Sequence, residues 1–191
     1  MKIYFFIFVL LINLQSWTKA DDIRDFQIEG MSLGESALKY FNMSTLEDNK
    51  EYEWFSDKSK KFIAISELKL NSSKTYESFQ IGVKYNDQDY RIAMLAGFVF
   101  YKNNINECYK KLDSISSDIK NLFNYINDLG KETYKHTADK SGKSSITDII
   151  LADQYGNEIS IQCYDWSDEL PYWDQLRIRI ANKDYTNWLR Y

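Results

Sequence analysis

Residues 163 to 174, CYDWSDELPYWD, carry the densest group of side chains suited to chemistry in this sequence. The stretch contains four carboxylates, four aromatic rings, the only proline and one of the two cysteines. A pair of carboxylates at a fixed separation serves as acid and base in glycoside hydrolysis. Exposed tryptophan and tyrosine rings are typical of binding surfaces, where they supply a large contact area. The segment therefore raises two functional hypotheses and a structural one.

The catalytic hypothesis assigns the acid and the base to the carboxylates and the stacking of a sugar to three rings. These residues are Asp165, Asp168, Glu169 and Asp174, with Trp166, Tyr172 and Trp173. The binding hypothesis uses four residues as a contact patch for a protein or a glycan. They are Trp166, Asp168, Tyr172 and Trp173. In the structural interpretation, Trp166, Leu170, Pro171 and Trp173 fold over one end of a sheet while the carboxylates face water.

Other catalytic and metal-binding patterns are incomplete. A metal site built from soft ligands would need more than one histidine, His136, and two cysteines. His136 lies in segment 131–144, whose polar composition predicts a mobile loop. A mobile loop is a poor place for a catalytic base, because the base must be held in a fixed position. Gly142-Lys143-Ser144 resembles the end of a phosphate-binding loop, but Thr137 stands where that motif requires glycine. We therefore expect no catalytic residue of these classes, no cofactor and no metal.

The first twenty residues have the three zones of a secretory signal peptide. A positive start at Lys2 precedes an apolar run over residues 3–14, and the small residue Ala20 ends the segment. A retained membrane anchor is the alternative, but about twelve apolar residues are fewer than the roughly twenty that span a bilayer. We expect cleavage after Ala20, export to the periplasm or the extracellular space, and no stable membrane insertion after cleavage.

The composition describes an acidic chain that can fold. Removal of residues 1–20 takes Lys2 and Lys19 from the 24 basic residues and leaves the 28 acidic residues unchanged. The formal net charge of the remaining chain is therefore about −6. This balance argues against nucleic-acid binding, which depends on clustered lysine and arginine. Because 44% of the residues are hydrophobic and 16% aromatic, residues 21–191 predict a single folded domain.

Apolar periodicity predicts an α+β fold. Alternating or continuous apolar residues predict six strands: 62–70, 76–85, 89–101, 146–152, 158–165 and 175–181. A three- and four-residue repeat predicts one long helix over 105–126, whose apolar stripe must lie on the sheet. Shorter elements are expected at the ends: a strand at 25–30, helices from the S-x-x-E patterns at Ser32 and Ser44, and a helix from Asp184. The order favours a mainly antiparallel sheet of about six strands packed by one long central helix.

The two cysteines lie on the inward faces of their elements. Cys108 is on the apolar stripe of the long helix, and Cys163 shares the apolar face of a late strand. In an oxidising compartment, two inward thiols commonly pair, which predicts a disulfide. Two free buried thiols are the alternative, because free cysteine is among the most buried residue types.

Two resemblances add to this interpretation. The stretches IEGMSLGESALKYF (28–41), NINECYKKL (104–112) and ISIQCYDWSDELPYWDQLRIRI (159–180) resemble a set of small, uncharacterised exported bacterial proteins without an established activity. Gly30-Met31-Ser32 before a helix is similar to the opening of the BamE/SmpA outer-membrane assembly family. This resemblance implies an adaptor function in the envelope. Because the lipid-bearing cysteine of that family is absent, the resemblance assigns no residue a role.

The sequence favours a binding or structural module of the envelope or extracellular space over an enzyme. Its partner would be an unknown protein or glycan, and nucleic acid is not expected. The alternative is a secreted hydrolase that acts on glycans through the acidic and aromatic segment 164–174.

Overall fold

The computed structural model describes residues 22–52, 60–102 and 104–190, so the predicted signal peptide lies outside the described residues. The described strands are β1 (Lys50–Glu51), β2 (Phe62–Leu68), β3 (Ser78–Lys84), β4 (Ile92–Tyr101), β5 (Asn127–Lys135), β6 (Ser145–Ala152), β7 (Glu158–Asp165) and β8 (Asp174–Ala181). The described helices are α1 (Met43–Asp48), α2 (Ile105–Leu122), α3 (Lys183–Arg190) and two 3-10 turns at Ile23–Asp25 and Ala37–Lys39. None of these helices is long and apolar enough to cross a bilayer.

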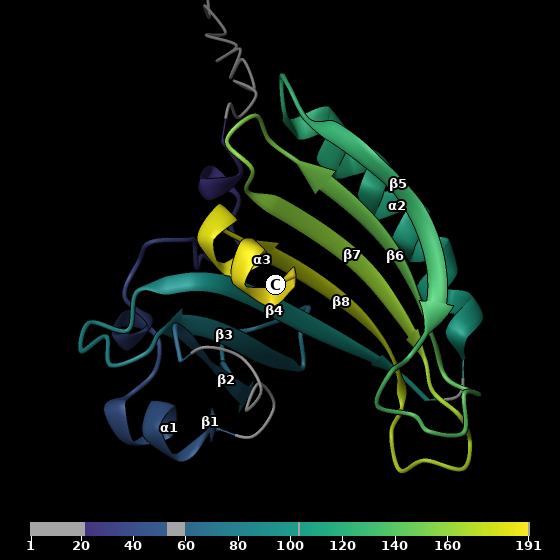
Figure 1. The fold of residues 1–191 in the computed structure, drawn as a ribbon, viewed down its shortest axis with the longest axis horizontal. Coiled ribbons are helices and arrows are strands. Elements are labelled where there is room, and N and C mark those ends of the chain that lie inside the picture. Colours follow the sequence, from purple (N-terminus) through teal and green to yellow (C-terminus); the bar gives the residue numbers. More distant parts are fainter. Residues whose placement is uncertain (1–21, 53–59, 103, 191) are drawn as a thin grey trace, which may run out of the picture.

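All eight strands form one antiparallel sheet in the order β1-β2-β3-β4-β8-β7-β6-β5. Strands β1 to β4 make one meander and β5 to β8 make another, and the two meet where β4 pairs with β8. Figure 1 shows the sheet curving from β1 and β2 at one side to β5 at the other. The connection from β4 to β5 contains α2, which crosses behind the second meander.

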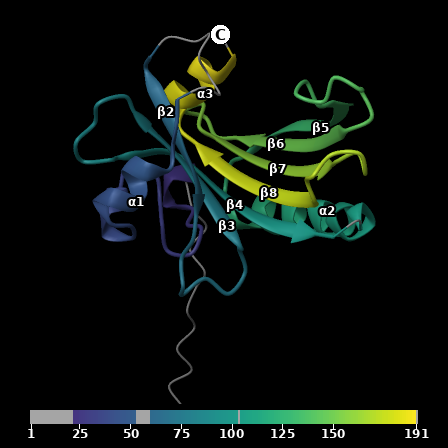
Figure 2. The same ribbon diagram turned by 90° about the horizontal axis from the view of Figure 1, so that it is seen from below.

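The convex face of the sheet carries the larger apolar core. Cys108, Leu112 and Ile119 of α2 are buried and face β7 and β8, as the helical stripe in the sequence requires. The N-terminal segment covers the same face over the first meander (Figure 2). Its buried apolar side chains include Ile23, Ile28, Met31, Ala37 and Leu46.

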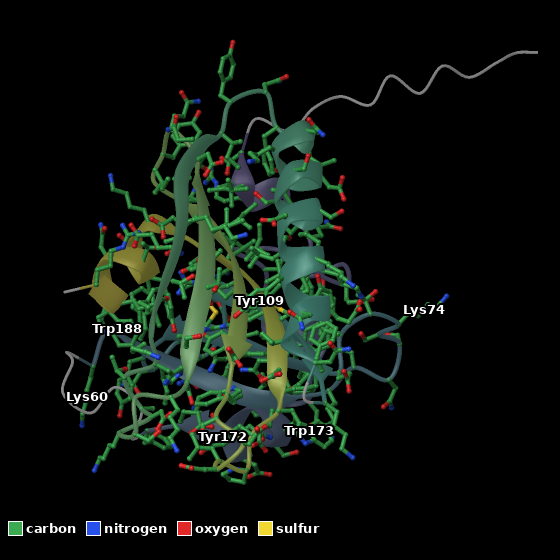
Figure 3. All side chains as sticks on the ribbon, turned by 90° about the vertical axis from the view of Figure 1, so that its right-hand side faces the viewer. Lys60, Lys74, Tyr109, Tyr172, Trp173 and Trp188 are labelled. Atoms are coloured by element: carbon green, nitrogen blue, oxygen red, sulfur yellow. A yellow bond between two sulfur atoms is a disulfide. The ribbon has the colours of Figure 1, made fainter. Side chains whose placement is uncertain are left out.

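The opposite face is covered only in part, by α3. Tyr185 and Trp188 of α3 pack with Phe62, Met94 and Ala181 in a second, smaller apolar cluster. Figure 3 shows Trp188 and α2 on opposite sides of the strands. Beyond α3, the rest of this face, from β2 to β5, carries polar and aromatic side chains, and we call it the polar face.

The prediction of about six strands is wrong, because the sheet has eight. β1 has only two residues, too few for an alternating pattern to appear. β5 overlaps the segment predicted to be a loop, and every one of its nine residues is exposed. Exposed edge strands often carry charged side chains, which hinder pairing with other chains. Because such side chains replace apolar ones, the sequence of β5 shows no apolar period. The strand predicted at 25–30 is absent; that segment contains only an isolated bridge.

The two capping patterns near the N-terminus do not begin helices where they were predicted. Glu35 accepts hydrogen bonds from the backbone and hydroxyl of Ser32, but the 3-10 turn that follows starts only at Ala37. Helix α1 is capped by Asn42 rather than by Ser44, because the Asn42 side chain accepts from a backbone N–H one turn along. In both segments a side chain accepts from nearby backbone N–H groups, as the capping patterns predict. The helical turns themselves begin at other residues than the patterns indicated.

The disulfide predicted from the sequence is present between Cys108 and Cys163. The two Cα atoms are 5.9 Å apart, and both side chains are fully buried between α2 and β7. No described cysteine is left free. The bridge therefore fixes the long helix on the strand that leads directly into residues 166–173.

Candidate functional site

Asp174, the last carboxylate of the 163–174 segment, is a structural group. It opens β8 with only 7% of its surface exposed, and its Oδ1 accepts a hydrogen bond from the backbone N of Trp166 at 3.0 Å. The carboxylate also bonds the backbone N of Ile105, the first residue of α2. Burial raises the pKa of Asp174 more than these bonds lower it. Asp174 therefore joins the strand, the connecting loop and the helix start.

The other three carboxylates have different environments. Asp165 is half-buried, and burial together with the charge of Asp168 raises its pKa. Asp168 is exposed, and Glu169 is exposed and forms an ion pair with Lys143. A raised pKa is what a general acid needs, so the catalytic hypothesis retains Asp165, with Asp168 beside it. It loses Asp174 because that carboxylate is buried and holds the backbone of Trp166.

The prediction of a loop over 131–144 is wrong for residues 131–135, which belong to β5, while 136–144 is a turn held by hydrogen bonds. The Asp139 carboxylate accepts hydrogen bonds from the backbone N and the Oγ of Ser144 at 2.8 and 2.7 Å, which lower its pKa strongly. Ser144 Oγ in turn accepts from the backbone N of Ser167 at 3.0 Å. This chain of bonds joins the 136–144 turn to the β7–β8 loop, so the two loops form one unit.

A first aromatic row runs along this unit through Tyr164, Trp166 and Tyr172. The ring centroids of Tyr164 and Trp166 are 6.1 Å apart, and those of Trp166 and Tyr172 are 4.7 Å apart. His136 packs against Trp166 at 4.3 Å, and its Nδ1 accepts from the backbone N of Ala138. Burial lowers the pKa of His136, so the ring is neutral at pH 7 and serves as a packing group. The row ends at Tyr172, which is 56% exposed.

A second aromatic row consists of Phe98, Phe100 and Trp173. Phe98 and Phe100 are stacked at 6.5 Å, and the edge of Trp173 meets Phe100 at 6.2 Å. Phe98 and Phe100 lie on the polar face of β4, and Trp173 is 51% exposed. Figure 3 shows Tyr172 and Trp173 at the same end of the sheet. The structure thus brings the two exposed rings together, each as the end of its own row.

The two rows begin at one residue, Arg177. Its guanidinium lies over the ring of Phe98, 5.5 Å from the centroid, and its Nη1 donates to the hydroxyl of Tyr164 at 3.2 Å. Its Nη2 donates to Oε1 of Gln80 at 2.6 Å. Arg177 therefore links the aromatic rows to the polar groups of the neighbouring strands.

A chain of hydrogen-bonded side chains crosses the polar face from β2 to β5. Consecutive members are joined at 2.6 to 3.5 Å. This polar chain consists of Ser66, Gln80, Arg177, Tyr164, Gln162, Asp148 and Tyr134. Sequence reasoning selected none of these residues, although an alternating polar pattern on β3, β7 and β8 shows that several share a face. The pattern does not reveal that they form one chain, in which every member except Tyr134 is buried or half-buried.

Asp148 gives the polar chain a pH dependence. Burial raises the pKa of Asp148 above its ordinary value of 3.8, despite hydrogen bonds from Gln162 and Tyr134. A carboxyl with a raised pKa in the folded state contributes stability below its unfolded pKa and loses it as the pH rises through the folded pKa. We expect wild-type stability relative to Asp148→Asn to fall as the pH rises above 3.8, the ordinary value for this carboxyl group, in urea unfolding at each pH. A relative gain with rising pH would contradict this.

Trp166 and Trp173 are expected to differ in their contribution to stability. Trp166 is half-buried against three rings, whereas Trp173 is half exposed and has one described ring contact, a T-shaped contact with Phe100. Trp166→Ala should lower the free energy of unfolding by about 2 kcal/mol, and Trp173→Ala by less than about 1 kcal/mol. Urea unfolding of both variants measures the difference. Equal losses would assign Trp173 to the fold and remove it from the candidate surface.

Two other kinds of site were sought in the described ranges. No group of three or more histidine, cysteine, aspartate or glutamate side chains there could hold a metal ion. An open pocket lies away from the aromatic rows, between the N-terminal segment and the start of α3. Three of its polar side chains already have partners, since Asn157 and Asn182 accept from backbone N–H groups of α3 and Arg24 pairs with Asp22. The aromatic rows are therefore the stronger candidate.

No protein-family model, curated protein or solved structure matches this chain. The fold and the candidate site define an α+β protein with one eight-stranded antiparallel sheet. The long helix covers one face of this sheet, and the aromatic rows and the polar chain lie on the other face. The resemblances drawn from the sequence remain expectations.

Proposed function

We propose that this chain is an exported, non-catalytic module that binds a glycan at the ends of the two aromatic rows. The observation that carries the proposal is the convergence of two rows of packed rings on Arg177, with Tyr172 and Trp173 exposed at their far ends. Rings of this kind present a large apolar surface at a fixed angle, with polar groups close by. Such a surface suits a saccharide, which has apolar ring faces and polar edges.

A protein partner fits the same surface less well. The centre of a protein interface is depleted of charge and fully desolvated. Here the loop that carries the two exposed rings also carries Asp168 and Glu169, which pairs with Lys143, and Arg177 lies at the other end of the aromatic rows. Alternating aromatic and charged groups favour a ligand that carries many hydroxyl groups.

The non-catalytic part of the proposal rests on the carboxylates. Asp174 is occupied by two backbone donors, and the neutral His136 is packed against Trp166. The hydrolase alternative would depend on Asp165 and Asp168. We expect Asp165→Asn to leave glycan binding intact, whereas Asp168→Asn also changes a residue of the binding surface and tests hydrolysis alone. Release of reducing ends by the wild type, lost in these variants, would overturn the non-catalytic assignment.

Export is supported by the buried disulfide, because such bridges persist in oxidising compartments. The signal-like segment 1–20 agrees with this location. Expression of the full chain in a Gram-negative host should yield an exported product whose N-terminal residue is Asp21. A product that retains Met1 would contradict cleavage.

The glycan proposal is tested by removing the exposed rings. Wild-type protein is titrated, by calorimetry and tryptophan fluorescence, with neutral and uronate-containing oligosaccharides of two to six sugars. Tyr172→Ala and Trp173→Ala should each weaken binding at least about tenfold, since exposed aromatic contacts of this kind dominate binding energy. Tyr155→Ala is the matched control, because Tyr155 is equally exposed, at 54%, in the β6–β7 turn at the other end of the strands. Absence of binding across the panel, or equal loss in the control, would overturn the proposal.

A further inference from the structure

We infer that the glycan is acidic and that the polar face holds the carboxylate of a uronic acid residue at Arg177, with Arg179 behind it. This inference rests on the proposed glycan-binding function and adds the ligand class. It follows from two guanidinium groups on one face of β8 whose described hydrogen-bond partners are all neutral, while the nearby carboxylates of Asp148 and Glu158 attract them only through space.

Arg177 is held in place by neutral groups, and no described carboxylate forms an ion pair with its guanidinium. Its described contacts are the Tyr164 hydroxyl, the Gln80 amide oxygen and the face of Phe98. Its Nε is buried and has no hydrogen-bond partner in the described part of the chain, so the Nη groups are the ones that a ligand can meet. Two Nη groups oriented by neutral acceptors offer a planar, two-pronged donor that matches a carboxylate. Arg177 is half-buried, so it remains within reach of a ligand that lies on the aromatic rows.

Arg179 adds a second, deeper positive charge on the same face. It is 8% exposed, its Nη2 donates to Ser160 Oγ at 2.7 Å, and its Nε has no partner among the described residues. Neither Arg177 nor Arg179 forms an ion pair with any described carboxylate. Burial and the neighbouring charge of Arg177 lower the pKa of Arg179. A buried cation with an unused donor is costly, and an anion nearby would reduce that cost.

The buried acidic side chains of this face, Asp148 and Glu158, attract Arg179 through space but form no described hydrogen bond with Arg177 or Arg179. Asp148 accepts from Gln162 and Tyr134, and Glu158 forms an ion pair with Arg190 at 2.7 Å. Burial is the first cause of a raised pKa at both carboxyl groups, which weakens them as counter-ions. A ligand carboxylate would therefore compete with no described ion pair at Arg177.

The charges at the exposed end orient the ligand. Asp168 and Glu169 lie on the loop that carries Tyr172, so a negative group at that end is repelled. The carboxylate is therefore directed inward to Arg177, and the remaining sugars run outward along Tyr172 and Trp173.

Calorimetric titration with two matched disaccharides tests the inference. One contains two glucose residues, and in the other a glucuronate replaces one glucose. We expect the wild type to bind the acidic disaccharide at least about tenfold more tightly, with a preference that weakens as salt is raised. Arg177→Gln should remove this preference. Arg91→Gln is the control, because Arg91 is an exposed arginine paired with Asp89, and it should keep the preference.

The outcomes separate the inference from the function on which it rests. Equal binding of both disaccharides by the wild type, still lost in Trp173→Ala, would overturn the acidic ligand and leave the glycan module. Binding of neither would overturn both. Arg177→Lys is the second variant in case the glutamine variant fails to fold, since lysine keeps the charge without the planar fork. It should bind the acidic disaccharide at least about threefold more weakly, and unchanged affinity would overturn the role of Arg177.

Discussion

Replacing both Cys108 and Cys163 with alanine is expected to lower the free energy of unfolding by about 4 kcal/mol. The bridge spans a sequence separation of 55 residues, and closing a loop of that length removes conformational entropy from the unfolded chain. A loss of this size is a large fraction of the stability of a typical domain. Urea unfolding of the wild type and of the double variant measures it.

Reduced wild-type protein is the control for the disulfide variant. It keeps both sulfur atoms in the core, so it separates the effect of the bond from the effect of smaller side chains. We expect the reduced protein and the Cys108→Ala/Cys163→Ala variant to agree within about 1 kcal/mol. Alkylation without reductant should label no thiol in the native protein. Two labelled thiols, or a double variant as stable as the wild type, would contradict the prediction.

Gly82→Ala is expected to destabilise the protein by about 1 to 3 kcal/mol in the wild type and by much less when Tyr185 is absent. A Cβ placed on Gly82 would lie 2.8 Å from Cζ of Tyr185, and closer still to another ring atom. Tyr185 is fully buried and packs on Phe62 and Trp188, with ring centroids 5.1 and 5.3 Å apart. Overpacking at such a contact carries a cost of this size.

A double-mutant cycle isolates this contact. Tyr185→Ala alone should lower the free energy of unfolding by about 3 to 5 kcal/mol, because a large buried ring is removed. In that background the added methyl group of Gly82→Ala has room, so the coupling energy should exceed about 1 kcal/mol. Gly97→Ala is the control: its Cβ would meet Tyr76 at 2.8 Å on the other face of the sheet. Relief of Gly97→Ala by Tyr185→Ala, or no relief of Gly82→Ala, would contradict the prediction.

The long helix and the disulfide illustrate what periodicity can predict. Residues three and four apart on α2 lie on one side, so Cys108 and Leu112 had to face the sheet. Residues two apart on β7 share a face, which placed Cys163 inward with Ile161. Local geometry alone decides these orientations, so they can be inferred without knowing the order of the strands.

β5 and the 136–144 turn illustrate the limit. β5 is an exposed edge strand with no apolar period, and only its pairing with β6 defines it as a strand. Asp139, Ser144 and Ser167 are distributed over 28 positions of the chain, and their hydrogen bonds depend on two loops meeting at one end of the sheet. A contact between two loops that are distant in the sequence cannot be predicted from the local pattern of either loop.

The amino-acid sequence by itself determined the long amphipathic helix, six of the strands and the inward position of both cysteines, because each follows from a repeat of two or of three to four residues. Only the tertiary structure decided that Asp174 serves the fold, that Tyr172 and Trp173 end two separate rows, and that Arg177 joins them. These relations require β4, β7 and β8 to be neighbours in one curved sheet, and strand order arises from contacts between distant segments of the chain.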